Sequence, residues 1–194
     1  MLRSICVFCG SSLGGSRIFQ DGARAMGHEI ARRGLTLVYG GGSVGLMGVL
    51  ADGALEAGGK VHGVIPQALD AKELGHTGLT HKDVVGSMHE RKARMAELSD
   101  GFVAMPGGIG TYEEIFEIWT WAQLGIHTKP LGFYNLDGFY DGLLAFMDKA
   151  TEDGFVRQTH RHMAVVADRP GALLDKFAQY VPVATPKWIT PAQS

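Results

Sequence analysis

Glycine clusters that separate a short apolar run from a helical pattern constrain this fold more than any other feature. Apolar runs at residues 4–9, 35–39 and 102–105 each end in such a cluster. After each cluster, apolar residues recur with the three-to-four-residue spacing of a helix. Repeated strand–helix units whose strands are continuous apolar runs form a parallel sheet that helices cover on both faces.

Further runs extend this pattern along the chain. Expected strands span 4–9, 35–39, 61–65, 102–105, 131–134 and 163–167, and expected helices span 18–33, 44–57, 88–98, 111–124, 139–151 and 172–180. The polar stretch 67–86 has neither spacing and is expected to form an irregular loop. We therefore predict an α/β fold: a Rossmann-like, doubly wound parallel sheet in three α/β/α layers. It forms a single domain over residues 1–181, followed by a loose tail over 182–194.

Composition argues against several functions. The chain has 194 residues and a formal net charge of −2, which argues against general binding of nucleic acid or anionic membranes. No apolar run has the length of a transmembrane helix and no signal peptide is recognisable, so we expect a cytoplasmic protein. Cys6 and Cys9 lie in a predicted buried strand and are expected to act as small hydrophobic residues rather than as a redox pair.

The three glycine-rich turns are candidate anion-binding sites. They are Gly10-Ser11-Ser12, Gly40-Gly41-Gly42-Ser43 and Gly107-Gly108-Ile109-Gly110-Thr111. Glycine lets backbone N–H groups approach an anion closely, and a helix N-terminus adds about half a positive charge. Neither the P-loop pattern nor a strict G-x-G-x-x-G follows the first strand. P-loop phosphoryl transfer and dinucleotide-dependent dehydrogenation are therefore disfavoured.

An acidic pair, Glu113-Glu114, follows the third turn. One interpretation is structural, because carboxylates in the first turn of a helix complement its dipole. The other is chemical: a carboxylate beside an anion site can stabilise the oxocarbenium-like state of glycosidic bond cleavage or activate a water. The residue types alone leave both interpretations open.

Arg91 is the second candidate for chemistry. Met88, Arg91 and Met95 are spaced to share one face of a helix, which places Arg91 on the apolar side. A charge there is costly unless it is paired, and a guanidinium near an anion site can bind a phosphate or carboxylate as a fork.

Two long motifs resemble the LONELY GUY family of cytokinin riboside 5'-monophosphate phosphoribohydrolases, whose members are often mislabelled lysine decarboxylases. The motifs are Met88-His89-Glu90-Arg91-Lys92 and Pro106-Gly107-Gly108-Ile109-Gly110-Thr111-Tyr112-Glu113-Glu114, and the resemblance extends over about residues 3–181. It implies hydrolysis of N6-modified AMP, with plain AMP as an alternative substrate, to the free base and ribose 5-phosphate.

The resemblance also implies roles for individual residues. Arg91 and Glu114 match the family's catalytic pair, and Ile109 stands where many members carry tyrosine. The nucleotide contacts that the resemblance implies are Glu73, Arg91, Lys92, Gly108, Ile109, Gly110, Thr111, Tyr112, Glu113, Glu114 and Thr120. The glycine-rich turns add Gly10, Ser11, Gly41, Gly42 and Gly107 to the expected contacts. The N6 substituent is expected in an apolar pocket, and the protein is expected to be a homodimer that needs no cofactor and no metal.

Two alternative functions fit the sequence less well. A non-catalytic nucleotide carrier or sensor of related fold would not need the catalytic pair, so Arg91 and Glu114 argue against it. An amino-acid decarboxylase normally needs pyridoxal phosphate on a Schiff-base lysine, and the sequence offers no recognisable site of that kind.

Overall fold

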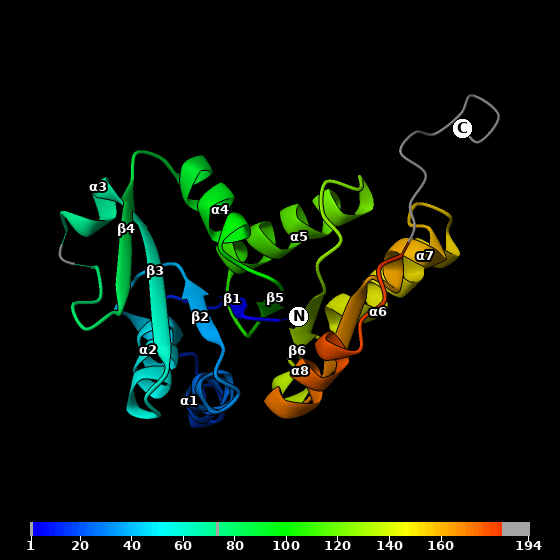
Figure 1. Ribbon diagram of the computed structural model, residues 1–194. Helices are drawn as coiled ribbons and strands as arrows, with labels where there is room; N and C mark the ends of the chain where they lie inside the picture. The colour runs from blue at the N-terminus through cyan, green and yellow to red at the C-terminus, as the bar shows by residue number, and fades with distance from the viewer. Residues whose placement is uncertain (1, 73, 184–194) are drawn as a thin grey trace.

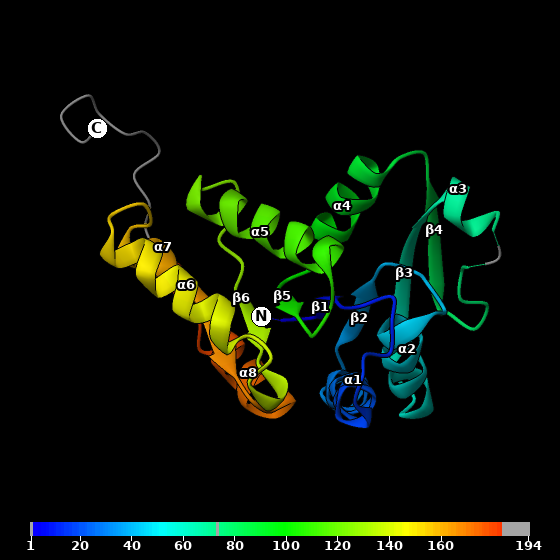
Figure 2. The same ribbon diagram turned by 180° about the vertical axis from the view of Figure 1, so that it is seen from behind.

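The computed structural model describes residues 2–72 and 74–183, and its centre is a parallel seven-stranded sheet in the order β4-β3-β2-β1-β5-β6-β7 (Figures 1 and 2). The strands are β1 (Ser4–Phe8), β2 (Thr36–Tyr39), β3 (Lys60–Pro66), β4 (His81–Val85), β5 (Phe102–Ala104), β6 (Leu131–Tyr134) and β7 (Ala164–Ala167). Every neighbouring pair is parallel, as predicted for the α/β class.

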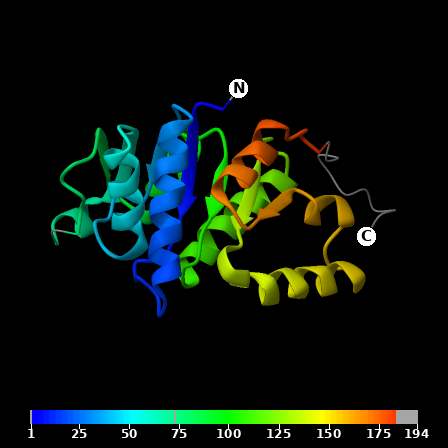
Figure 3. The same ribbon diagram turned by 90° about the horizontal axis from the view of Figure 1, so that it is seen from below.

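Helices cover both faces of the sheet and complete the three layers. In Figure 1, α1 (Arg17–Arg32), α2 (Gly45–Glu56) and α8 (Pro170–Ala178) lie below the sheet, and α4 (Met88–Glu97) and α5 (Ile109–Gln123) lie above it. Figure 3 shows α1, α2 and α8 from their own side. The remaining elements are α3 (Gln67–Asp70), the 3-10 turn η1 (Leu136–Gly138), α6 (Asp141–Glu152) and α7 (Gln158–Arg161).

The buried core consists of two apolar clusters, one on each face. Along β1, Ile5 and Val7 belong to the cluster between the sheet and helices α1 and α2, while Cys6 and Phe8 belong to the cluster between the sheet and helices α4 and α5. A strand that is buried on both faces reads as a continuous apolar run, which is why the sequence predicts β1. Both cysteines are buried free thiols.

One strand contradicts the expected loop over residues 67–86. Strand β4, with the sequence His-Lys-Asp-Val-Val, pairs in parallel with β3 at the edge of the sheet, and α3 occupies the start of the same stretch. An edge strand needs no continuous apolar run, because much of its surface faces solvent. Val84 is half exposed, so the apolar signal used to predict the other strands is missing here.

The winding of the sheet reverses beside β1, which has β2 on one side and β5 on the other. The loops that leave β1 and β5 therefore diverge to opposite faces. They are joined at their base, where the Gly10 N–H donates to the Pro106 carbonyl at 3.1 Å. Such a switch point opens a crevice at the carboxyl ends of the strands, where ligands of this fold class bind.

Within the described ranges, no helix combines the length and hydropathy needed to cross a membrane. Residues 184–194 lie outside the described residues, so the loose tail and the domain boundary at residue 181 stay predictions.

Candidate active site

The phase of helix α4 aims Arg91 into the protein. The Ser87 side chain caps the helix by accepting from the Glu90 N–H at 3.1 Å, and the Glu90 carboxylate accepts from the Gly86 N–H at 2.7 Å. This reciprocal arrangement fixes the first turn of the helix. As predicted, Arg91 and Met95 are then buried, but Met88 is half exposed because it stands at the first position of the helix.

Arg91 is held at two points. Its Nε donates to the Val64 carbonyl of β3 at 3.2 Å, and its Nη1 donates to the Glu114 Oε1 of α5 at 2.9 Å. Both side chains of the pair are about 10% exposed. The two candidate catalytic residues, separately inferred from different motifs, therefore form one buried ion pair.

Burial raises the pKa of the Glu114 carboxyl, and the nearby Arg91 guanidinium opposes that rise without cancelling it. The raised pKa makes this carboxylate a stronger base than an exposed one, which suits a group that accepts a proton during a reaction. Burial likewise raises the pKa of the neighbouring Cys9 thiol, so the thiol is protonated and not a nucleophile.

The ion pair faces a cavity of about 300 Å³ at the switch point between β1 and β5. Polar groups from Ser11, Arg91, Thr111 and Glu114 line part of it. The remaining wall consists of glycine backbone and apolar side chains: Val7, Phe8, Cys9, Gly10, Gly40, Met47, Leu69, Met95, Gly108, Ile109 and Gly110. A small molecule with one charged end and one apolar end matches such a lining.

The N-terminus of α5 is open towards this cavity. Gly108 is the N-cap and makes no side-chain capping bond, and among the described residues the N–H groups of Ile109, Gly110 and Thr111 have no acceptor. A Cβ built on Gly108 or Gly110 would meet no heavy atom within 4 Å. Unpaired N–H groups at the positive end of a helix form a ready anion site.

The N-terminus of α2 is used differently. Its Leu46 N–H donates to the Gly10 and Ser12 carbonyls, at 3.0 and 3.3 Å. The preceding glycines also serve the protein itself: Gly42 bridges to Gly75, and the Gly41 carbonyl accepts from the His76 N–H at 2.9 Å. The second glycine turn therefore anchors the segment after α3.

The expected nucleotide contacts divide into two groups. Gly10, Ser11, Arg91, Gly108, Ile109, Gly110, Thr111 and Glu114 line the cavity, whereas Gly41, Gly42, Lys92, Gly107, Tyr112, Glu113 and Thr120 do not. Glu73 lies outside the described residues.

Lys92 illustrates the second group. Its Nζ lies 2.5 Å from Glu113 Oε1 and 3.1 Å from Glu117 Oε2. Burial lowers the pKa of Lys92, but these hydrogen bonds outweigh burial and the pKa is raised. Thr120 is exposed on α5, and its hydroxyl donates to the Phe116 carbonyl at 2.7 Å.

Several cavity residues were not among the expected nucleotide contacts: Cys9, Met47, Leu69 and Gly40, the last of which belongs to the second glycine-rich turn. Cys9 and Gly40 directly follow strands whose ends meet at the switch point, so their place along the chain was a usable signal. Met47 and Leu69 are ordinary apolar residues, and only the folded chain shows that they face the cavity.

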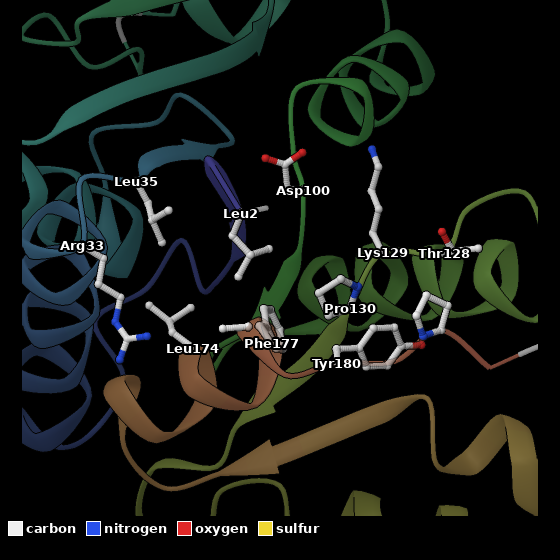
Figure 4. Close-up of a pocket in the computed structure, with 12 residues that line it drawn as sticks. Leu2, Arg33, Leu35, Asp100, Thr128, Lys129, Pro130, Leu174, Phe177 and Tyr180 are labelled. Carbon is white, nitrogen blue, oxygen red and sulfur yellow. The ribbon is translucent and has the colours of Figure 1, made fainter.

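A larger hollow of about 520 Å³ lies among Leu2, Asp100, Lys129, Phe177 and other residues, at the amino-terminal edge of the sheet (Figure 4). Its charged groups are already paired with the protein. Asp100 accepts from the Arg3 N–H at 2.8 Å, and Lys129 donates to the Ala96 carbonyl at 2.8 Å. Among the described residues that line this hollow, no acidic and basic side chains form a buried pair like Arg91 and Glu114.

Comparisons with known proteins agree with the resemblance seen in the motifs. A family model described as "Possible lysine decarboxylase" matches residues 47–177. The "Probable cytokinin riboside 5'-monophosphate phosphoribohydrolase LOGL9" of Oryza sativa subsp. japonica is 55% identical over 183 residues, covering 93% of this chain and 80% of the relative. The "Cytokinin riboside 5'-monophosphate phosphoribohydrolase LOG2" of Arabidopsis thaliana is 48% identical over 180 residues, covering 93% and 84%.

The chain belongs to the LONELY GUY family. Solved structures of more distant proteins share the fold of this LONELY GUY member. The molybdenum cofactor binding protein of Rippkaea orientalis matches with a TM-score of 0.70 at 21% identity, over 92% of this chain and 97% of that one. The molybdenum cofactor carrier protein of Chlamydomonas reinhardtii matches with a TM-score of 0.69 at 21% identity, over 92% and 98%.

Proposed function

We propose that this protein hydrolyses the N-glycosidic bond of N6-modified adenosine 5'-monophosphates, releasing the free base and ribose 5-phosphate. The observation that carries the proposal is the buried Arg91–Glu114 pair, which faces the same cavity as the open N-terminus of α5. The names of the plant relatives state this activity for those proteins.

The N-terminus of α5 binds the 5'-phosphate in this proposal. The N–H groups of Ile109, Gly110 and Thr111 donate to its oxygens, and the Ser11 and Thr111 hydroxyls lie in the same cavity. Glu114 follows Gly110 by about one helical turn, roughly 6 Å along the axis. That separation is within the reach of a ribose 5-phosphate, so a phosphate bound at the helix end brings C1' of the sugar towards Glu114.

Glu114 acts at the sugar. The bond between C1' and the base nitrogen breaks with both electrons leaving on the base, and C1' develops oxocarbenium character. The Glu114 carboxylate stabilises that cation and takes a proton from the water that attacks C1'. The departing base takes up a proton in turn. The raised pKa of Glu114 makes it a better proton acceptor than an exposed carboxylate.

Arg91 orients this carboxylate and limits its pKa rise, since one guanidinium nitrogen donates to Glu114. Among the described residues its Nη2 has no hydrogen-bond partner, and the side chain lines the cavity. Nη2 therefore donates to the sugar or the phosphate of the bound nucleotide in this proposal.

Lysine decarboxylation, which the family model's description suggests, fits the cavity poorly. A decarboxylase of the pyridoxal type needs a lysine that can form a Schiff base in the pocket. The described residues that line the cavity include no lysine, and Lys92 is paired with two glutamates beside it.

One assay tests the function. The protein is incubated with N6-isopentenyladenosine monophosphate, AMP or lysine, and the products are separated by chromatography. Free base and ribose 5-phosphate support the proposal. Bound but unchanged nucleotide supports a carrier or sensor instead, and decarboxylated lysine supports an amino-acid decarboxylase. Glu114→Ala should abolish hydrolysis, while Glu97→Gln, at an exposed carboxylate of α4, should not.

We further propose that the active unit is a homodimer in the cytoplasm. Exposed apolar side chains gather at the two ends of α5, where Ile109 is 81% and Ile126 65% exposed. Thr120, which the resemblance makes a nucleotide contact, is exposed on α5 and does not line the cavity of its own chain. In this proposal it contacts the nucleotide bound by a second copy of the chain. Light scattering after gel filtration should give twice the 20.8 kDa chain mass, and Ile126→Glu should shift it towards the monomer.

A further inference from the structure

The Nη2 end of the Arg91 guanidinium occupies the place where a side chain would begin at Gly40, the first residue after β2. A Cβ built on residue 40 would lie 1.8 Å from Arg91 Nη2, 3.0 Å from Cζ and 3.5 Å from Nε. The first distance is far shorter than any real non-bonded contact. The guanidinium therefore occupies the space that any side chain at position 40 would need.

Backbone conformation does not explain this glycine. Gly41, the next residue, has a φ of 75°, which L residues rarely adopt, but Gly40 is not among the described residues with positive φ. Alanine could adopt the backbone of Gly40 without strain. The requirement for glycine at position 40 is one of space, and the space is filled by a single side chain.

Arg91 has little freedom to yield without losing its contacts. Its residue is 8% exposed, Nε is bonded to the Val64 carbonyl, and Nη1 is bonded to Glu114. The atom that a methyl group would strike is the far end of a flexible side chain. The guanidinium would swing away while the backbone of β2 stays in place.

We propose that Gly40 is a positioning residue that sets the catalytic geometry of Arg91, and this rests on the proposed roles of Arg91 and Glu114. The absent side chain leaves room for the Nη2 end of the guanidinium beside Gly40 while Nη1 stays bonded to Glu114. A methyl group at position 40 moves the guanidinium off Glu114 and leaves that carboxylate buried without its cation.

The test is a double-mutant cycle with Gly40→Ala and Arg91→Ala, assayed on N6-isopentenyladenosine monophosphate. Gly40→Ala should lower kcat by about 100-fold or more, the usual cost of losing one preorganised electrostatic group. It should also move the acid limb of the pH–rate profile to higher pH, because Glu114 loses the charge that restrains its pKa. In the Arg91→Ala background there is no guanidinium to displace, so adding Gly40→Ala should change kcat less than about twofold.

Gly142→Ala is the matched control, because a Cβ there meets no heavy atom within 4 Å, and it should leave kcat and the pH profile unchanged. If the Arg91→Ala enzyme is too slow for a further loss of kcat to be measured, the midpoint of urea denaturation is compared across the same four proteins. Gly40→Ala should lower the midpoint in the wild-type background and not in the Arg91→Ala background.

Equal losses from Gly40→Ala in both backgrounds would overturn the inference, as would a Gly40→Ala enzyme with wild-type kcat and pH profile beside an inactive Arg91→Ala. A fully active Arg91→Ala enzyme is a different result, since it refutes the catalytic role of Arg91 on which the inference rests.

Discussion

Removing one partner of the Arg91–Glu114 pair should destabilise the protein far more than removing both. Each residue is under 10% exposed, so a lone charge left at this position is largely desolvated. Breaking a buried pair from one side costs about 3–5 kcal/mol, whereas replacing both partners with apolar residues of similar volume is often neutral or stabilising. The adjoining 300 Å³ cavity can admit water to the remaining charge, so we expect about 3 kcal/mol for each single variant.

The two single variants should differ in their pH dependence. In Arg91→Met, the lone Glu114 can shed its charge by binding a proton, and loss of the guanidinium raises its pKa further. A folded-state pKa raised above the unfolded value gives stability at low pH that is lost as pH rises through the folded pKa. The deficit of Arg91→Met should therefore shrink between pH 8 and pH 5. In Glu114→Leu the lone guanidinium stays charged, so its deficit should persist.

Urea denaturation of the wild type, the two single variants and Arg91→Met/Glu114→Leu at pH 5 and pH 8 measures these quantities. The double variant should be within about 1 kcal/mol of the wild type and inactive. Single variants that each cost less than about 1 kcal/mol at pH 8 would refute the reasoning. They would show that the pair is solvated through the cavity and is not a buried ion pair in the energetic sense.

Two further substitutions test contacts that support the fold and the site. Glu29→Gln should cost about 1–2 kcal/mol at pH 7, because hydrogen bonds from Arg32 and Arg33 outweigh burial and hold the pKa of Glu29 at about 2. This lowered pKa gives stability above pH 4.5 that is lost as pH falls towards 2, so urea midpoints of the two proteins should converge in acid. Tyr140→Phe should cost about 1–2 kcal/mol and raise KM more than it lowers kcat, because its buried hydroxyl donates to the Met105 carbonyl at 2.6 Å, just before the third glycine-rich turn that we propose binds the phosphate. An unchanged KM would separate this contact from ligand binding.

The sheet could be predicted from the sequence because most of its strands are buried on both faces. Such strands are continuous apolar runs, and the glycine clusters mark where they end. Strand β4 was not predicted, because its stability comes from pairing with β3 rather than from burial of its own side chains. Backbone pairing leaves no mark in the residue types, so an edge strand of this kind reads as a polar loop.

The residue patterns single out Arg91 and Glu114 one at a time, but they do not predict how the two side chains are arranged. Helical spacing placed Arg91 on the inward side of α4, and the acidic pair placed Glu114 in the first turns of α5. Their bond depends on where the two helices meet above the sheet, which no local pattern encodes. Lys92 follows Arg91 directly and shares its family motif, yet it pairs with Glu113 and Glu117 outside the cavity. Adjacent residues on a helix point in directions about 100° apart, so Arg91 faces the cavity while Lys92 faces the two glutamates beside it.

The three glycine-rich turns look equivalent in the sequence, but physical reasons for their glycines differ. At Gly108 the missing side chain keeps the end of α5 accessible to an anion, since nothing else occupies that space. At Gly41 the reason is a positive φ, and at Gly40 it is the volume of a guanidinium supplied by α4. Only the first of these is the anion-binding role that glycine clusters suggest. Alanine at position 108 should therefore weaken phosphate binding and alanine at 41 should weaken folding through backbone strain, whereas alanine at 40 should lower both kcat and the urea midpoint only while Arg91 is present.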